Sequence, residues 1–275
     1  MDHSLLSDVN IYKFLLEQII APRHLFPIFK PNTYREIKKA NKKSVTQWDA
    51  SVDVLICGFG CAGLSAAIEA HDLDSSADVL VIEKAPEEFE GGNCRVSGQS
   101  MLISKNKESL KDYQRKMSAA NPMSEEWLEF WADSMVNLEP WIQQIAKDAG
   151  QEFLRGTGFT SREAVLEFPE YGARDAVAYT STILPIPSGV WMALRANAAK
   201  RGVKVRYNSR LVDLIQDPDT LDVFGAWIEE NGVRKAIRAK RGVIMATGGY
   251  ENSDYMQNHY YGLSNVKPFG TPYNE

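Results

Sequence analysis

The sequence predicts an α/β fold, with a parallel β-sheet covered by helices and an additional β meander. Three observations support this class. Residues 53–83 have the pattern of a buried strand, a glycine turn, a helix and a second buried strand, which is a βαβ unit. Apolar residues recur at helical spacing over 124–145. From 203 to 240 apolar and polar residues alternate, as they do in antiparallel strands.

The remaining elements follow from local signals. Pro140 is expected to kink or split the helix over 124–145. Ser188 is expected to cap a helix that stops at Gly202. The tripeptide ENG predicts a hairpin turn between two of the alternating stretches, and 241–251 is expected to be a last buried strand that runs into a glycine pair. The meander therefore returns to the parallel sheet.

Composition excludes several classes of function. The 275 residues are 44% hydrophobic and 24% charged, which suits one large globular domain or two small ones. A net charge of −5 argues against a nucleic-acid partner. The three cysteines form no metal-binding spacing, so we expect no metal and a reduced, cytoplasmic protein. No signal peptide and no apolar run of roughly 20 residues is found, so no transmembrane segment is expected.

The chain is expected to begin with an extension, residues 1–48, ahead of a cofactor-binding domain over 49–275. Within the extension, apolar residues over 11–20 have helical spacing, and a polar, basic run follows at 35–43. The first interpretation is a docking helix and a solvated linker. The alternative is that this helix and linker contact a partner protein or an anionic lipid.

The first glycine turn indicates a dinucleotide site. It has the spacing Gly58-x-Gly60-x-x-Gly63, after a strand over 52–57 and before a helix from Ala62. Gly58 allows the tight turn, Gly60 lets the backbone approach a pyrophosphate, and Gly63 lets the helix pack on the strand. Amides at the start of the helix would donate hydrogen bonds to the phosphates.

An acid and a second glycine loop indicate which dinucleotide binds. Glu83 ends the second strand about 20 residues after the turn, where its carboxylate would accept hydrogen bonds from ribose hydroxyls and disfavour the 2′-phosphate of NADP. The stretch GGNCRVSGQS, residues 91–100, adds short polar side chains at Asn93 and Ser97 between glycines. A long cofactor such as FAD needs this second loop for its flavin end. An NAD-dependent dehydrogenase is the alternative.

The chain resembles FAD-dependent oxidoreductases related to fumarate reductase and succinate dehydrogenase flavoproteins, a family that includes 3-ketosteroid dehydrogenases. The resemblance covers about 48–275 and depends on the two glycine stretches, on VLVIEK, on GVKVRYNSRLVDLI and on GVIMATGGYE. It implies a Rossmann-like FAD-binding fold and a set of cofactor-binding residues: Gly58, Gly60, Ala62, Gly63, Glu83, Lys84, Gly92, Asn93, Cys94, Ser97, Gly98, Gln99, Leu211, Thr247, Gly248 and Gly249.

The resemblance implies that these residues bind different parts of FAD. The first glycine turn with Ala62 would face the pyrophosphate, and Thr247 to Gly249 would close over it. Leu211 would lie at the adenine, and the second loop would lie along the flavin. Gln99 departs from the family's small-Gly-Gly triplet, which leaves its backbone contact open. The second loop has no histidine, so FAD is expected to be non-covalent.

The resemblance also implies an activity: hydride transfer between flavin N5 and a carbon–carbon bond next to a carbonyl or carboxylate, as in fumarate reductase. A 3-ketosteroid dehydrogenase and a non-catalytic FAD-binding fragment or interaction module are the alternatives. The substrate would be a small molecule, and the electron donor or acceptor is open. Catalytic residues are not assigned, although Tyr171 and Tyr179 are candidate phenolic donors. Relatives continue into a capping domain, so the chain ending at Glu275 is expected to be catalytically incomplete.

Overall fold

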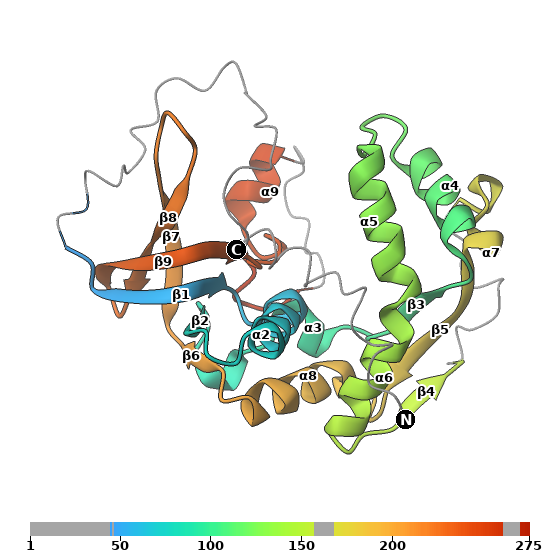
Figure 1. Ribbon diagram of the computed structural model, residues 1–275, viewed down its shortest axis with the longest axis horizontal. Helices are drawn as coiled ribbons and strands as arrows, with labels where there is room; N and C mark the ends of the chain where they lie inside the picture. Colours follow the sequence, from blue (N-terminus) through green and yellow to red (C-terminus); the bar gives the residue numbers. More distant parts are fainter. Residues whose placement is uncertain (1–44, 46, 157–167, 261–269) are drawn as a thin grey trace. The chain divides into compact units, whose positions relative to one another are not determined.

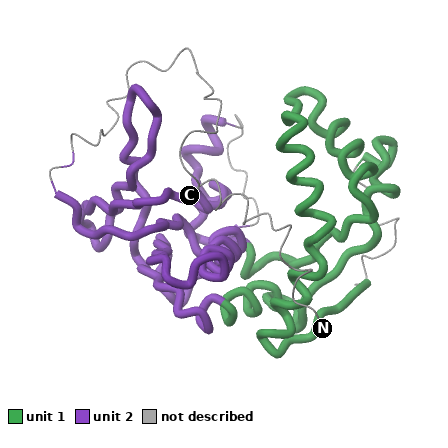
Figure 2. The backbone as a smooth tube through the Cα atoms, viewed as in Figure 1, with its two compact units in different colours: residues 1–14, 94–197 green, residues 15–93, 198–275 purple. Residues whose placement is uncertain are grey.

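The computed structural model describes residues 45, 47–156, 168–260 and 270–275, and these residues form two compact units (Figure 2). Unit 1 comprises Cys94–Asn197, and unit 2 comprises the described residues before and after it. The predicted N-terminal helix and basic run lie outside the described residues. The domain boundary near residue 48 stays a prediction.

Unit 2 contains a six-stranded sheet with the order β6-β2-β1-β9-β8-β7 (Figure 1). Strand β1 pairs in parallel with β2 and β9, and β2 pairs in parallel with β6. Strands β7, β8 and β9 pair antiparallel, which confirms the predicted meander. The strands are β1 Ala50–Cys57, β2 Val79–Ile82, β6 Lys204–Arg206, β7 Ser209–Gln216, β8 Val223–Glu230 and β9 Val233–Met245.

The core of unit 2 explains why β1 and β2 are so apolar. Leu55 and Ile56, neighbours that point to opposite faces of β1, are both fully buried. The 13-residue helix α2, Cys61–Leu73, packs against β1 and β2. A cluster of buried side chains on the sheet joins Leu55 and Ile82 to Ile228 of β8. Burial on both faces is the environment that the continuous apolar pattern predicts.

Unit 1 contains a three-stranded antiparallel sheet, which the sequence analysis did not predict. Its order is β3-β5-β4, with β3 Met101–Ser104, β4 Phe153–Arg155 and β5 Val177–Ile183. The short helices among the described residues of both units are η3 Glu87–Phe89, α3 Gly92–Val96, η4 Pro169–Tyr171, α7 Ala173–Ala176 and α9 Asp254–Tyr260. The longer helices are α4 Lys107–Met117, α5 Glu125–Val136, α6 Leu138–Asp148 and α8 Gly189–Lys200.

Proline 140 splits the helical stretch as predicted. Helix α5 ends at Val136, and α6 begins at Leu138, so Pro140 lies in the first turn of α6. A proline in the first turn interrupts no hydrogen bond, because amides there have no partner within their own helix. The side chain of Ser124 caps α5 by accepting a hydrogen bond of 3.3 Å from the amide of Trp127.

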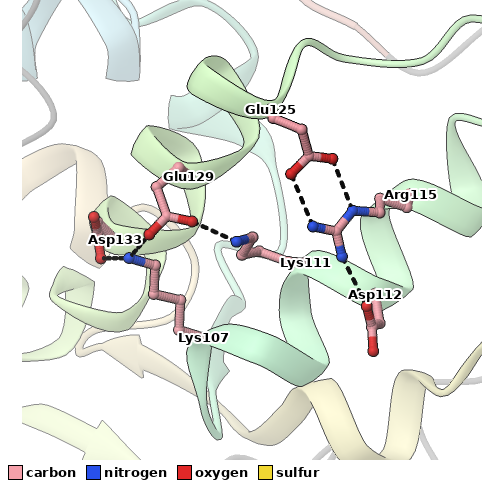
Figure 3. A network of polar contacts seen from close by, with 7 residues as sticks. All are labelled: Lys107, Lys111, Asp112, Arg115, Glu125, Glu129 and Asp133. Carbon is pink, nitrogen blue, oxygen red and sulfur yellow. Dashed lines mark hydrogen bonds and ion pairs between the residues drawn. The ribbon is translucent and has the colours of Figure 1, made fainter.

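Charged side chains connect α4 to α5 (Figure 3). Lys107 contacts both Glu129 and Asp133, and Lys111 contacts Glu129. Arg115 donates two hydrogen bonds, of 3.0 and 2.9 Å, to Glu125. Hydrogen bonds from Lys107 and then Lys111 lower the pKa of Glu129 from its ordinary 4.5 to about 2. The ionised carboxylate therefore stabilises the fold above pH 4.5, and this contribution is lost as the pH falls toward 2.

We expect Glu129→Gln to lower the melting temperature at pH 7, because both lysines lose their carboxylate. The difference from the unchanged protein should narrow below pH 4.5 and at high salt, since protonation and screening weaken the same pairs. Thermal unfolding from pH 7 to pH 3 measures this. Glu126→Gln, an exposed position on the same helix, is the matched control. An equal decrease in both variants would show that the pairs with Glu129 contribute nothing.

Candidate cofactor site

Four parallel strands end together at one edge of the sheet in unit 2. Cys57, the last residue of β1, pairs with Ile82 of β2 and with Met245 of β9. Ile82 in turn pairs with Arg206, the last residue of β6. The residues that follow these strand ends include the first glycine turn and Glu83. Ligands of open α/β sheets bind at the carboxyl ends of the strands, so this edge is the place to look for a cofactor.

Gly58 and Gly63 are required by the protein's own packing. Gly58 has φ +112°, and a Cβ there would lie 2.2 Å from the carbonyl oxygen of Ala246. A Cβ on Gly63 would lie 1.9 Å from the carbonyl oxygen of Gly58. Both distances are far below van der Waals contact. The start of α2 therefore packs directly on the turn, which is the role that the sequence predicts for Gly63.

Gly60 differs, because no described residue requires a glycine there. Its φ of −78° suits any amino acid. The nearest heavy atom to an added Cβ is the carbonyl oxygen of Gly91 at 3.7 Å, an ordinary contact. Across this space, a Cβ on Gly92 would lie 3.9 Å from the Cα of Gly60. The two glycine segments thus meet in unit 2, and the absence of a side chain at Gly60 is not explained by packing.

The N-terminus of α2 adjoins this space. No side chain caps the helix at Gly60, while Cys61 and Ala62 in its first turn are exposed. Helix amides at an uncapped N-terminus and the positive end of the helix dipole attract phosphate groups. A pyrophosphate passing Gly60 would meet both. These residues therefore fit a dinucleotide.

Glu83 joins the glycine turn to the end of β2. Its Oε2 accepts a hydrogen bond of 2.9 Å from the amide of Phe59, and its Oε1 accepts one of 2.8 Å from the amide of Ala85. Each carboxylate oxygen has a further lone pair. Glu83 can therefore fix the turn and also accept hydrogen bonds from ribose hydroxyls. The first of these tasks is not visible in the sequence.

Residues 270–275 lie against the second glycine segment of unit 2 and against the residues that follow β9. The side chain of Asn93 accepts a hydrogen bond of 3.1 Å from the amide of Thr271. Gly248 has φ +73°, and a Cβ there would lie 3.0 Å from Oδ1 of Asn274. The amide of Ala246, just before the exposed Thr247, donates to the carbonyl of Cys57. The sequence suggests none of these contacts, because they join positions far apart in the chain.

A hollow of about 690 Å³ lies near Lys84 in unit 2. Lys84 donates a hydrogen bond of 3.3 Å to the carbonyl of Glu275, and burial lowers its pKa. Leu211 is partly buried on β7, next to Arg210. The hollow is lined by Lys84, Asn208, Arg210, Glu229, Asn231, Gly232, Ser253, Tyr255, Met256, Tyr260, Tyr273 and Glu275. Lys84 and the residues beside Leu211 thus share one concave surface.

The rest of the second loop belongs to unit 1. Ser97 and Gly98 are exposed, and Cys94 is half-buried. No described atom lies within 4 Å of a Cβ added to Gly98. Packing therefore does not require a glycine at this position, as it does not at Gly60. Gln99 is buried instead, with φ +55°. Its side chain points into unit 1.

The two candidate phenolic donors also lie in unit 1. Tyr179 is on β5, with the Arg155 guanidinium 4.9 Å from its ring centre. Burial, followed by the nearby Glu139 carboxylate, raises the pKa of Tyr179 to about 12, so the phenol is protonated at neutral pH. The ring of Tyr171 stacks on Phe168 at 5.2 Å. The hydroxyl oxygen of Tyr179 is buried, so the structure does not favour this residue over Tyr171 as a donor to a ligand.

Among the described residues, no group of three His, Cys, Asp or Glu side chains could hold a metal ion. No helix in the same part of the chain is long and apolar enough to cross a membrane.

The parallel sheet, the glycine turn at the end of β1 and the acid at the end of β2 define a dinucleotide-binding protein. The model of the FAD binding domain family matches residues 53–271, and the chain belongs to this family. This match confirms the prediction of FAD over NAD and the predicted α/β, Rossmann-like class.

Known relatives agree with the family. The chain is 28% identical to the acrylate reductase flavoprotein subunit of Shewanella woodyi over 223 residues, which are 77% of this chain and 42% of that protein. It is similar to the structure of a 3-ketosteroid-Δ4-(5α)-dehydrogenase from Rhodococcus jostii, with a TM-score of 0.63, 25% identity, and coverage of 82% of this chain and 51% of that one. The chain thus spans about half or less of the length of these relatives.

A flavocytochrome c3 fumarate reductase has a similar fold. Its TM-score is 0.56 at 23% identity, with coverage of 78% of this chain and 36% of that one. The resemblance to fumarate reductases and ketosteroid dehydrogenases that the sequence suggests is therefore confirmed at the level of the family.

We expect Gly60→Ala to weaken FAD binding and Gly63→Ala to lower the stability of the fold. At Gly60 the new methyl group has room in the protein but takes the ligand's space, so FAD affinity should fall by about tenfold or more while stability changes by less than about 0.5 kcal/mol. At Gly63 the methyl group overlaps a backbone oxygen, so stability should fall by about 2 kcal/mol or more. Chemical denaturation and FAD titration measure the two effects. Undiminished FAD binding by Gly60→Ala would contradict the assignment.

Proposed function

We propose that this chain is the FAD-binding part of an oxidoreductase that moves a hydride between flavin N5 and a carbon–carbon bond next to a carbonyl or carboxylate. The observation that carries the proposal is that the protein's own packing does not require a glycine at Gly60, between the uncapped start of α2 and the second glycine segment. The names of the relatives support the redox class, since one is an acrylate reductase subunit and another is a ketosteroid dehydrogenase.

In this proposal, unit 2 holds the adenosine and pyrophosphate. The amides at the start of α2 donate to the phosphates, and the absence of a side chain at Gly60 permits their approach. Glu83 accepts hydrogen bonds from the ribose hydroxyls while it also accepts one from the amide of Phe59. The remaining residues proposed for this end are Gly58, Ala62, Gly63, Lys84, Gly92, Leu211, Thr247, Gly248 and Gly249.

The flavin end takes Asn93, Cys94, Ser97 and Gly98 in the same proposal. Residues 91–100 contain no histidine, so binding of FAD is non-covalent. Bound FAD supplies the hydride chemistry, and the protein supplies position and electrostatics. Tyr171 and Tyr179 are both kept as candidate hydrogen-bond donors to a substrate carbonyl.

An α,β-unsaturated acid is the preferred substrate class, because acrylate is such an acid and the acrylate reductase subunit is a relative. A 3-ketosteroid is the second candidate, supported by the similarity to the dehydrogenase structure. A non-catalytic FAD-binding module is the third. Reduction of acrylate and fumarate with a reduced dye, and oxidation of 3-ketosteroids with an artificial acceptor, distinguish them.

The assay should use the chain, and also the longer protein if the reading frame continues beyond Glu275. The proposal expects FAD binding by residues 1–275, and FAD-dependent turnover of one substrate class by the longer protein, on the order of 1 per second or faster. Gly60→Val provides the control that lacks cofactor. A longer protein that retains FAD but turns over neither class would favour the non-catalytic module.

We expect Glu83→Gln to weaken FAD binding by roughly 1.5–3 kcal/mol, the range for hydrogen bonds to a charged group. The new amide group also places a donor against an amide of the turn, so the melting temperature should fall slightly. Asp213→Asn, an exposed change in the same unit, is the control for loss of one negative charge. FAD titration of both variants measures the effect. Equal affinity in both variants would refute the role given to Glu83.

A further inference from the structure

Gln99 occupies a backbone position that suits glycine better than other residues. Its φ of +55° lies in the left-handed region, which disfavours residues with a side chain. The residue is nevertheless 7% exposed, so the side chain is inside unit 1. Its interactions must therefore offset a cost that glycine would avoid.

The carboxamide of Gln99 connects two helices of unit 1. Its Nε2 donates to the carbonyl of Cys94 at 2.6 Å and to that of Arg95 at 3.4 Å, both in α3. Its Oε1 accepts hydrogen bonds from the amides of Val190 at 2.6 Å and Trp191 at 3.3 Å, the second and third residues of α8. Gln99 thus caps α8 from 91 residues away in the sequence.

This contact corrects the prediction made for Ser188. Ser188 precedes α8, but its hydroxyl donates to the carbonyl of Arg95 at 2.6 Å. The hydroxyl therefore holds the same stretch of α3 that Gln99 holds. The capping oxygen for α8 comes from Gln99.

The backbone of Gln99 is also engaged. Its amide donates to the hydroxyl of Ser97 at 3.2 Å, and its carbonyl accepts from the hydroxyl of Thr182 at 3.0 Å. Every polar group of Gln99 therefore has a partner within unit 1. A buried residue whose side-chain donors and acceptors are all engaged is suited to hold a loop in shape.

We propose that Gln99 is a positioning residue, which presets the conformation of residues 94–98 for the flavin end of FAD without contacting the cofactor. The inference rests on the proposed function, which gives this loop to the flavin. A loop that already has its bound shape loses less conformational entropy when the ligand binds. Removal of the side chain should then weaken the binding of the flavin end alone.

ADP separates the two ends of the cofactor. It contains the adenosine and pyrophosphate of FAD and lacks the flavin, so it probes the groups proposed in unit 2. The affinities of Gln99→Leu for FAD and for ADP should be compared by calorimetric titration. We expect FAD affinity to fall by about tenfold or more and ADP affinity to stay within about twofold. The absorption bands of FAD bound to Gln99→Leu should also differ from those of FAD bound to the wild-type protein.

Gln99→Gly provides a second variant, since it removes the carboxamide and suits the left-handed φ. It keeps the test valid if Gln99→Leu does not fold. Gln144→Leu, an exposed change in the same unit, is the matched control and should alter neither affinity. A fall in the ratio of FAD to ADP affinity in Gln99→Gly supports the proposal.

Three outcomes would overturn it. An unchanged ratio would mean that Gln99 acts on the fold alone, and a higher FAD affinity in Gln99→Gly would mean that its side chain obstructs the site. If the unchanged protein bound neither FAD nor ADP, the proposed function would fail together with this inference. If the wild-type protein binds FAD and ADP but Gln99→Gly leaves the ratio of the two affinities unchanged, this inference fails while the proposed function stands.

Discussion

The close contact between α2 and the end of β1 is the constraint on which the rest of unit 2 depends. A Cβ on Gly63 would lie 1.9 Å from the carbonyl oxygen of Gly58, so helix and turn meet backbone to backbone. This contact directs the start of α2 at the edge where four parallel strands end. In the proposed function, the amides of the helix and the backbone of Gly60 face the same phosphates.

Two side chains around this edge hold other parts of unit 2 in place. Glu83 holds Phe59 and Ala85 with the carboxylate oxygens that the proposal assigns to the ribose. Asn93 holds Thr271 from the second glycine segment. These groups are therefore held in place by the protein's own hydrogen bonds. A preorganised site of this kind limits the entropy lost on binding.

Local patterns in the sequence predicted unit 2 well. The βαβ unit is visible because its strands are continuously apolar and its turn needs glycines at fixed spacing. Pro140 acts through its own ring, so its effect is equally local. The motif predicts different roles for Gly60 and Gly63. In the structure a Cβ would fit at Gly60 and would overlap a backbone oxygen at Gly63.

Unit 1 shows where such prediction ends. Strand β5 contains Thr180, Ser181 and Thr182, and its neighbours β3 and β4 have four and three residues, so no clear alternation marks this sheet. The capping of α8 by Gln99 joins residues 91 positions apart, and a serine stands at the expected place. Contacts of this range depend on the folded chain, which local patterns do not describe.

A crystal structure of the protein with bound FAD would test the central claim most directly. The account predicts pyrophosphate oxygens about 3 Å from the amides at the start of α2, above Gly60, with the ribose hydroxyls on the carboxylate of Glu83. Asn93 and the exposed residues Ser97 and Gly98 should lie toward the flavin. Pyrophosphate bound away from Gly60, or a Glu83 carboxylate without a ribose, would contradict it.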